Sequence, residues 1–333
     1  MRASLSGFRF LVLAATMLVV AAGPRDAAAQ AAKAPTKVTL RLDWKPGGQH
    51  VPFYYGKDLG YYAAEGIELT ILAGSGSSDS VKQLGAGAVD MALVDALVMT
   101  QAAEQKVPVK SVAAYYQRTP IVLISPKAKP ITDVKQLSSG AKIGTKRAST
   151  TSQALTALMA VAHIDPKTVN VVDIGFGVQP LLVGQVDALM GFTMNESIEA
   201  EKAGMPVHEL MLADHGVNAY GLVVATSDKF LKSNPEVVAA FVRATRRAVA
   251  ETLAHKQAAA ESLAKAVSEI DVPREVLVVE KTAPFWMVRG KDAASFGSQD
   301  LQGWQQTVDT AKRVGLLENA PAAKDLFAAG PGR

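Results

Sequence analysis

A short pattern occurs twice in this chain and constrains its fold more than any other feature. Residues 87–93 read GAVDMAL, and residues 184–190 read GQVDALM. In each copy a glycine suited to ending a helix precedes an aspartate and then an apolar run suited to a strand. The repeat predicts two similarly built lobes, with chance similarity in an Ala/Val-rich chain as the alternative. Because α/β sheets bind ligands beyond the carboxyl ends of their strands, Asp95 and Phe192 are expected to face each other across a crevice.

Short β-rich runs alternate with helical patterns along the chain, which is typical of an α/β fold with mainly parallel sheets. One helix is expected over residues 50–65 and another over 235–255, where apolar side chains recur at helical spacing. Ser233 and Glu236 are expected to form the capping box of the second. Strands are expected at 38–42, 67–72, 91–94, 109–114, 121–125, 142–144, 169–172, 188–191 and 221–225.

Residues 1–30 have the features of a cleaved signal peptide. Arg2 and Arg9 give a basic start, residues 10–23 are almost wholly apolar, and three alanines at 27–29 supply a cleavage pattern. The apolar run is shorter than the roughly 20 residues that a membrane-spanning helix needs, which disfavours an anchor. Since no cysteine follows to carry a lipid, the mature protein is expected to be free in the periplasm.

The chain contains no cysteine, which excludes disulfides, thiolate metal sites and a cysteine nucleophile. Its five histidines show no metal-ligand spacing, and no Ser/His/Asp set is evident. The net charge is +4, charges of both signs are interspersed, and no basic run indicates nucleic-acid binding. We therefore expect no metal or cofactor and no nucleic-acid partner. We also expect a monomeric protein.

Residues 43–50, DWKPGGQH, carry the strongest local signal for a binding site, because they follow an expected strand and form a turn before a helix. Asp43 offers a carboxylate for an amino group, Trp44 an apolar stacking face, and His50 a ring nitrogen. Tyr54 lies four residues after His50, so a helix places both side chains on one face. Capping and packing of the strand end is the alternative for Asp43 and Trp44.

Other candidate groups also lie at expected strand ends or between the lobes. The small residues of 74–80 and the hydroxyl-rich residues of 146–152 precede helices, whose free N–H groups can receive an anion or a carbonyl oxygen; helix capping is the alternative. Asn195 and Glu196 follow an expected strand end, and a glutamate at position 196 can accept a hydrogen bond from an exocyclic amine; solvated helix capping is the alternative. The candidate ligand-binding residues are Asp43, Trp44, His50, Tyr54, Ser77, Ser78, Asp95, Thr150, Phe192, Asn195, Glu196 and Tyr220.

The start of the expected mature chain contains a series of short motifs, Leu42-Asp43-Trp44, His50, Pro52-Phe53-Tyr54, Gly60-Tyr61-Tyr62 and Glu65-Gly66-Ile67. In these residues the chain resembles the thiamine pyrimidine-precursor binding proteins, which are substrate-binding components of ABC importers related to the fungal pyrimidine synthase. The resemblance continues through residues 87–90, 174–176, 186–188, 195–196 and the helix after Pro235. These later segments also resemble wider relatives that bind sulfonates, nitrate or aromatic acids.

The resemblance implies the type II periplasmic binding protein fold, in which two mixed sheets are flanked by helices and the chain crosses between lobes twice. The crossings are expected near 119–125 and 218–225. This gives a first lobe of residues 36–119 plus 223–325 and a second lobe of residues 120–222.

By matching motif, the resemblance implies that Trp44, His50, Tyr54 and Glu196 contact a heterocycle. The family usually has an asparagine shortly after the proline, where this chain has Gly47 and Gly48. A polar contact is therefore lost, and the ligand can differ from that of the family's pyrimidine binders.

The resemblance implies capture of a small heteroaromatic solute, such as a pyrimidine precursor of thiamine, for an ABC permease in the inner membrane. The alternatives are a flavin, an aromatic acid or a sulfonated acid as the ligand, or delivery to a receptor instead of a transporter. An enzyme like the fungal synthase is disfavoured, because the resemblance implies a cysteine-rich iron site for it and this chain has no cysteine.

Overall fold

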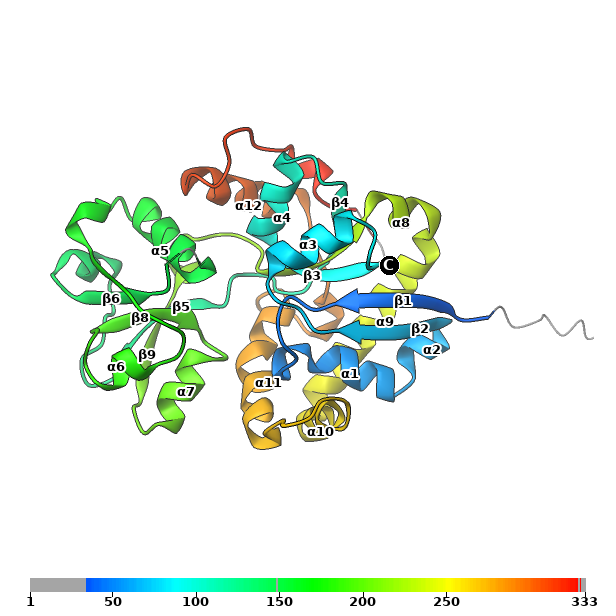
Figure 1. Cartoon of the computed structure of the whole chain (residues 1–333), viewed down its shortest axis with the longest axis horizontal. Helices are drawn as coiled ribbons and strands as arrows, with labels where there is room; N and C mark the ends of the chain where they lie inside the picture. The colour runs from blue at the N-terminus through cyan, green and yellow to red at the C-terminus, as the bar shows by residue number, and fades with distance from the viewer. Residues whose placement is uncertain (1–33, 148, 329, 331–333) are drawn as a thin grey trace, which may run out of the picture. The chain divides into compact units, whose positions relative to one another are not determined.

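The structure is a computed structural model, and it describes residues 34–147, 149–328 and 330. The expected signal peptide, residues 1–30, lies outside the described residues. Residues Pro35–Arg333 form one unit, in which the chain builds two five-stranded sheets (Figure 1). No helix in the described part of the chain is both long enough and apolar enough to cross a membrane.

The first sheet has the strand order β2-β1-β3-β10-β4. β1 is parallel to β2 and β3, whereas β10 is antiparallel to both β3 and β4. The strands are β1 (Thr36–Arg41), β2 (Ile67–Leu72), β3 (Met91–Asp95), β4 (Val109–Ala114) and β10 (Leu222–Ser227). We call the part of the chain built on this sheet the first lobe.

The second sheet repeats this plan with the order β7-β6-β8-β5-β9. β6 is parallel to β7 and β8, and β5 is antiparallel to β8 and β9. The strands are β5 (Ile121–Pro126), β6 (Lys142–Thr145), β7 (Asn170–Asp173), β8 (Ala188–Phe192) and β9 (Val207–Met211). The part built on it is the second lobe, and the predicted α/β fold with two mixed sheets is confirmed.

The chain crosses between the two sheets twice. Residues 115–120 connect β4 of the first sheet to β5 of the second, and residues 212–221 connect β9 of the second sheet to β10 of the first. The strands expected at 121–125 and 221–225 are present as β5 and β10. The segments expected to cross, 119–125 and 218–225, therefore each include the end of a connection and the strand that follows it.

Helices cover both faces of each sheet. The first lobe holds α1 (Val51–Asp58), α2 (Tyr61–Ala64), α3 (Ser77–Gly85), α4 (Ala96–Glu104), α8 (Asp228–Ser233), α9 (Pro235–Ala254), α10 (Lys256–Ala266), α11 (Val272–Trp286) and α12 (Leu301–Arg313). The second lobe holds α5 (Thr150–Val161), α6 (Gln179–Leu182) and α7 (Glu196–Lys202). Short 3-10 helices are η1 (Gly48–His50), η2 (Val134–Ser138), η3 (Pro166–Thr168), η4 (Leu212–His215), η5 (Ala293–Ser295) and η6 (Ala323–Asp325).

Two helix predictions were only partly right. The expected helix over 50–65 is divided into α1 and α2, because Gly60 between them has the left-handed φ of 72° that ends a helix. The long helix over 235–255 is present as α9, but its capping box is absent. Ser233 belongs to α8, and Asn234 precedes α9 without a side-chain cap bond.

The repeat that suggested two lobes marks equivalent positions in the two sheets. Gly87 and Gly184 both have left-handed φ angles, 73° and 71°, after the ends of α3 and α6. The strands β3 and β8 then begin directly after Asp90 and Asp187. The repeated sequence therefore encodes the same helix-to-strand turn in both lobes.

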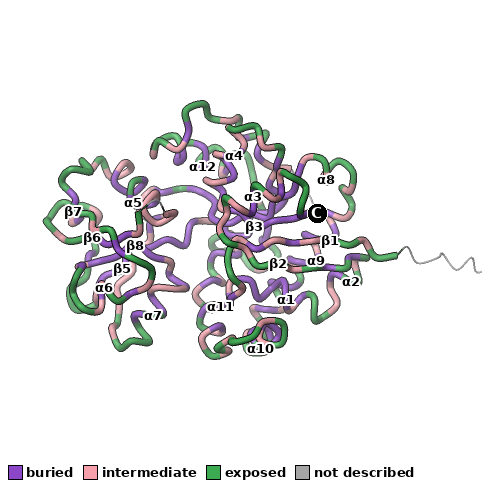
Figure 2. The backbone as a smooth tube through the Cα atoms, in the orientation of Figure 1, coloured by how far each residue is buried: buried purple, intermediate pink, exposed green. Residues whose placement is uncertain are grey.

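The central strands of each sheet are largely buried, as the purple parts of the tube in Figure 2 show, and two hydrophobic clusters accompany each sheet. In β3, Met91 and Leu93 join one hydrophobic cluster while Ala92 and Val94 join another, as expected for a strand covered on both faces. The cluster that contains Met91 also includes Met194 and Ile198 of the second lobe. Apolar side chains of the two lobes are therefore in contact.

Candidate functional site

Asp43 and His50 form a close pair just after β1 ends. Oδ1 of Asp43 lies 2.8 Å from Nε2 of His50, whose side chain is completely buried. Nδ1 of His50 has no hydrogen-bond partner among the described residues. The neighbouring Trp44 is 45% exposed, and Tyr54 is buried on α1, where burial raises the pKa of its hydroxyl to about 12. The segment thus combines a fixed polar pair with an accessible indole.

The turn between Asp43 and His50 is held by residues from distant parts of the first lobe. The buried carboxylate of Glu275 accepts a hydrogen bond from the N–H of Gly48, and the hydroxyl of Tyr115 donates to the carbonyl of Gln49 at 2.6 Å. A Cβ at Gly48 would lie 2.6 Å from the carbonyl oxygen of Glu275 and 2.7 Å from Cβ of Val278. The absence of a side chain at position 48 is therefore explained by close packing against α11.

Asp95 lies at the end of β3 and caps α4. Its Oδ1 accepts hydrogen bonds from the N–H groups of Leu97 and Val98 at 2.9 and 3.3 Å, and its own N–H donates to Oγ of Ser77. Burial raises the pKa of Asp95 to about 6, which the two cap bonds oppose and nearby Asp43 reinforces. Asp95 and Ser77 thus have structural partners beside the Asp43–His50 pair.

The second-lobe candidates cluster where β8 ends and α7 begins. The N–H of Phe192 donates to Oε2 of Glu196 at 2.8 Å, and burial is the main reason that the pKa of this carboxyl is raised. Asn195 precedes α7 without making a side-chain cap bond. Thr150 lies elsewhere, as the first residue of α5, where Ser149 supplies the cap.

The end of the second sheet that carries Phe192 is in contact with the first lobe. Phe192 packs against the hydrophobic cluster that contains Met194 and residues of β1, α1 and α11. Ion pairs reinforce this contact, since Nζ of Lys281 on α11 lies 3.4 Å from Oε1 of Glu209 on β9. The candidates at the end of β8 therefore lie on the side of the second lobe that meets the first.

Ser78 and Tyr220, like Thr150, lie apart from the Asp43–His50 pair. Ser78 is exposed and borders a groove of about 570 Å³ between α3 and α4. Tyr220 borders a cavity of about 200 Å³ between the two chain crossings, and its hydroxyl already accepts a hydrogen bond from the N–H of Asp300. Neither cavity is lined by residues 43–50.

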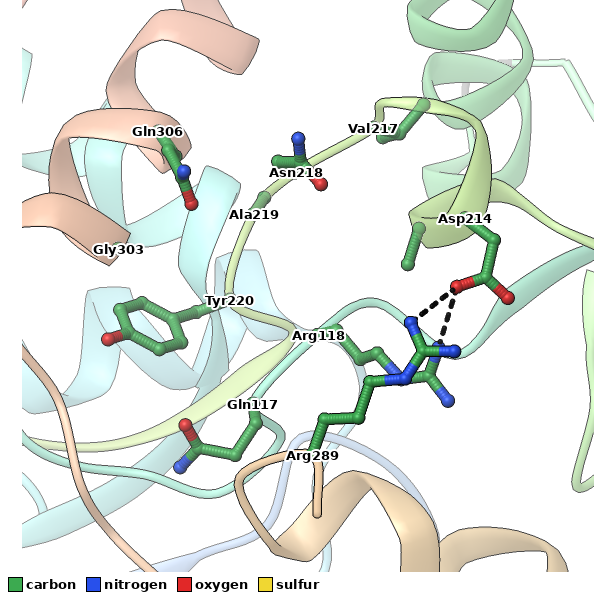
Figure 3. Close-up of a pocket in the computed structure, with 11 residues that line it drawn as sticks. Gln117, Arg118, Asp214, Val217, Asn218, Ala219, Tyr220, Arg289, Gly303 and Gln306 are labelled. Atoms are coloured by element: carbon green, nitrogen blue, oxygen red, sulfur yellow. Dashed lines mark hydrogen bonds and ion pairs between the residues drawn. The ribbon is translucent and has the colours of Figure 1, made fainter.

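The cavity between the crossings is polar and is organised by an ion triad (Figure 3). Nη1 of Arg118 and Nη1 of Arg289 lie 3.3 and 3.4 Å from the same oxygen, Oδ1 of Asp214. The side chains of Gln117 and Asn218 are also part of its wall. Because Asp214 already faces both guanidinium groups, the triad is a contact between the crossings and the segment after α11.

The sequence interpretation missed Glu275 and Tyr115. Glu275 lies 227 positions from the Gly48 N–H to which it bonds, and nothing around it in the sequence distinguishes it from an ordinary helix residue. No set of three or more His, Asp or Glu side chains that could hold a metal ion occurs in the described part of the chain. The side chains of Asp43, Trp44 and His50 offer hydrogen bonding, charge and aromatic stacking.

Comparison with known proteins places this chain in one family. Residues 48–259 match the family model described as NMT1/THI5 like. The riboflavin-binding protein RibY of Chloroflexus aurantiacus is 31% identical, and the alignment covers 94% of this chain and 91% of that protein. The formylaminopyrimidine-binding protein of Halalkalibacterium halodurans is 25% identical, with 87% of this chain and 89% of that protein covered.

A solved structure shows the same fold at low sequence identity. The periplasmic aliphatic sulphonate binding protein SsuA from Escherichia coli superimposes with a TM-score of 0.70 at 14% identity, over 89% of this chain and 93% of that one. The chain has the fold of the periplasmic binding proteins and belongs to the NMT1/THI5 like family.

Proposed function

We propose that this protein is the substrate-binding component of an ABC importer and captures a flat nitrogen heterocycle between its two lobes. The observation that carries the proposal is the exposed indole of Trp44 beside the Asp43–His50 pair at the end of β1. Ligands of α/β sheets bind beyond the carboxyl ends of the strands, which is where these side chains lie. An aromatic face next to fixed polar groups suits a ligand that is flat and carries hydrogen-bonding edges.

Each candidate side chain has a role in this proposal. Trp44 stacks on the ring, and the partly exposed carboxylate of Asp43 accepts from an amino or ring N–H group of the ligand. Glu196 offers a second acceptor from the other lobe. His50 and Tyr54 support the site from beneath, because both are buried. Closure of the lobes around the ligand replaces its water shell with these groups.

Two relatives support this class of ligand, since one is named for riboflavin and the other for formylaminopyrimidine. Riboflavin and formylaminopyrimidine are both flat heterocycles with ring nitrogen atoms, and each also carries oxygen, as ring carbonyl groups in riboflavin and as a formyl group in formylaminopyrimidine. Binding is favoured over synthesis because the chain has no cysteine for the iron site that the fungal pyrimidine synthase is expected to need. The proposal includes periplasmic location after removal of a signal peptide, a monomeric state and delivery to a membrane permease.

The test begins with mass spectrometry of any ligand released from the purified native protein. Ligand-free protein is then titrated with riboflavin and with formylaminopyrimidine by calorimetry and by thermal shift. A true ligand present at 100 times its Kd should stabilise the protein by about 2.7 kcal/mol. Trp44→Ala should weaken binding and Trp44→Phe should largely retain it. The proposal would be contradicted if the protein bound neither compound and the native protein released no ligand.

A further inference from the structure

A second exposed aromatic ring lies in the loop after β7. The side chain of Phe176 is 73% exposed, and Nζ of Lys146 lies 3.3 Å from the centroid of its ring. Lys146 follows β6, which is parallel to β7 and hydrogen-bonded to it. The two side chains therefore lie together at the carboxyl end of the second sheet, where α/β sheets bind ligands.

The loops that carry this pair are tied to each other. The N–H of Arg147 donates to Oδ1 of Asp173 at 2.9 Å, and Nε of Arg147 lies 3.4 Å from Oδ2 of the same carboxylate. In addition, the N–H of Ile174 donates to the carbonyl of Thr145 at 3.1 Å. These bonds involve the residues on either side of Lys146 and the two residues that end β7 and begin its loop, just before Phe176. They fix the starts of the two loops relative to each other.

The position of this pair corresponds to that of Trp44 in the first lobe. The order β7-β6-β8 in the second sheet repeats β2-β1-β3 in the first, so Lys146 after β6 is the counterpart of Trp44 after β1. β8 ends beside them at Phe192, which packs against the core of the first lobe. Figure 1 shows β1 and β2 ending on the side of the second lobe. Both aromatic groups thus belong to the strand ends at which the lobes approach each other.

We propose that Phe176 and Lys146 form the second-lobe face of the ligand site. Phe176 covers the face of the flat ring opposite to Trp44, and the ammonium of Lys146 pairs with an electron-rich oxygen at the ring's edge. This inference rests on the proposed function and adds the residues that set specificity in the second lobe. Single exposed apolar side chains are common on protein surfaces. Phe176 differs from them because a cation lies over its ring, hydrogen bonds join its loop to the neighbouring loop, and it lies at the strand ends that face the first lobe.

The test uses riboflavin and formylaminopyrimidine as probes and compares the wild-type protein with Phe176→Ala, Phe176→Tyr and Lys146→Met. Loss of the ring should raise Kd about tenfold, as expected for loss of one aromatic stacking contact, whereas tyrosine should bind within about twofold of wild type. Lys146→Met should also raise Kd. Val183→Ala is the control, because Val183 is a 71% exposed apolar side chain of the same lobe outside these loops.

The outcomes separate this inference from the proposed function. If wild-type protein binds a probe and Phe176→Ala binds it equally well, the role of Phe176 is overturned while the proposed function stands. Equal weakening by Val183→Ala would also overturn it, because the effect would then not be specific to the ring. If wild-type protein binds neither probe and releases no ligand, the proposed function fails and this inference fails with it.

Discussion

His50 is completely buried, and the carboxylate of Asp43 is the one hydrogen-bond partner that its side chain has among the described residues. Asp43→Ala would leave both ring nitrogens buried without a partner, which should lower the free energy of unfolding by about 1–3 kcal/mol. Asp43→Asn keeps an acceptor oxygen, so it should cost less stability while still weakening ligand binding through the lost charge. Urea unfolding and calorimetric titration of both variants check this, and equal destabilisation by the two would contradict it.

At position 48, the addition of a single Cβ atom is expected to lower stability. Gly48→Ala should lower the free energy of unfolding by about 1–3 kcal/mol, because its Cβ would lie 2.6 Å from a backbone oxygen of α11. Gly47→Ala is the matched control, since its Cβ would meet only the flexible side chain of Gln49. Thermal and urea unfolding should show the larger loss for position 48. A larger loss at position 47 would refute the packing explanation.

At the scale of elements, the residue that caps the N-terminus of α4, Asp95, makes the stability of the protein depend on pH. Burial raises the pKa of Asp95 from 3.8 to about 6, so between these values the folded protein binds more protons than the unfolded chain. The contribution of Asp95 to stability should therefore fall as pH rises from about 4 to about 6.

Asp95→Asn tests this coupling because asparagine is an equally good cap and does not titrate. The variant should lose this part of the pH dependence and should be no less stable than wild type at pH 7, as measured by urea unfolding between pH 4 and pH 7. Asp187→Asn is the control with the opposite sign, since the backbone N–H of Lys142 and the side chain of Lys129 lower the pKa of Asp187. A wild-type slope in Asp95→Asn would exclude Asp95 as its source.

At the scale of the whole molecule, ion pairs link α11 of the first lobe to the second lobe. Lys281 lies 3.4 Å from Glu209 and 4.0 Å from Glu201, and Lys202 lies 2.8 Å from Asp271 just before α11. The same helix carries Glu275, which holds the turn at Gly48. α11 therefore connects the candidate binding turn to the contact between the lobes.

Lys281→Met should weaken the approach of the lobes and raise the Kd of the ligand by up to about fivefold, in line with about 0.2–1 kcal/mol for an exposed pair. The difference from wild type should shrink at high salt, because these pairs are partly exposed. Lys256→Met is the control, since Lys256 pairs with Glu280 within the first lobe at 3.0 Å. Calorimetry at low and high salt measures both variants, and equal effects would argue against a role between the lobes.

Much of the fold could be predicted because its signals are local. The strands that begin after Asp90 and Asp187 were identified from a glycine, an aspartate and an apolar run, and the structure has β3 and β8 there. β9 was missed because residues 207–211 read VHELM, and an edge strand that is mostly half-buried lacks a clear apolar pattern. Similarly, the break at Gly60 was overlooked because the apolar pattern continues across it.

The sequence by itself determined the alternation of strands and helices, the duplication of one turn in two lobes, and the family. Each of these depends on short patterns of residues that are close together in the chain. Only the tertiary structure decided which side chains hold the turn after β1. Glu275 is hydrogen-bonded to Gly48 although the two are 227 positions apart in the sequence. Phe176, which follows β7, and Phe192, which ends β8, both belong to the carboxyl end of the second sheet. Such contacts arise when buried apolar faces pack two sheets and their helices together, so their partners are chosen by the packing and not by proximity in the chain.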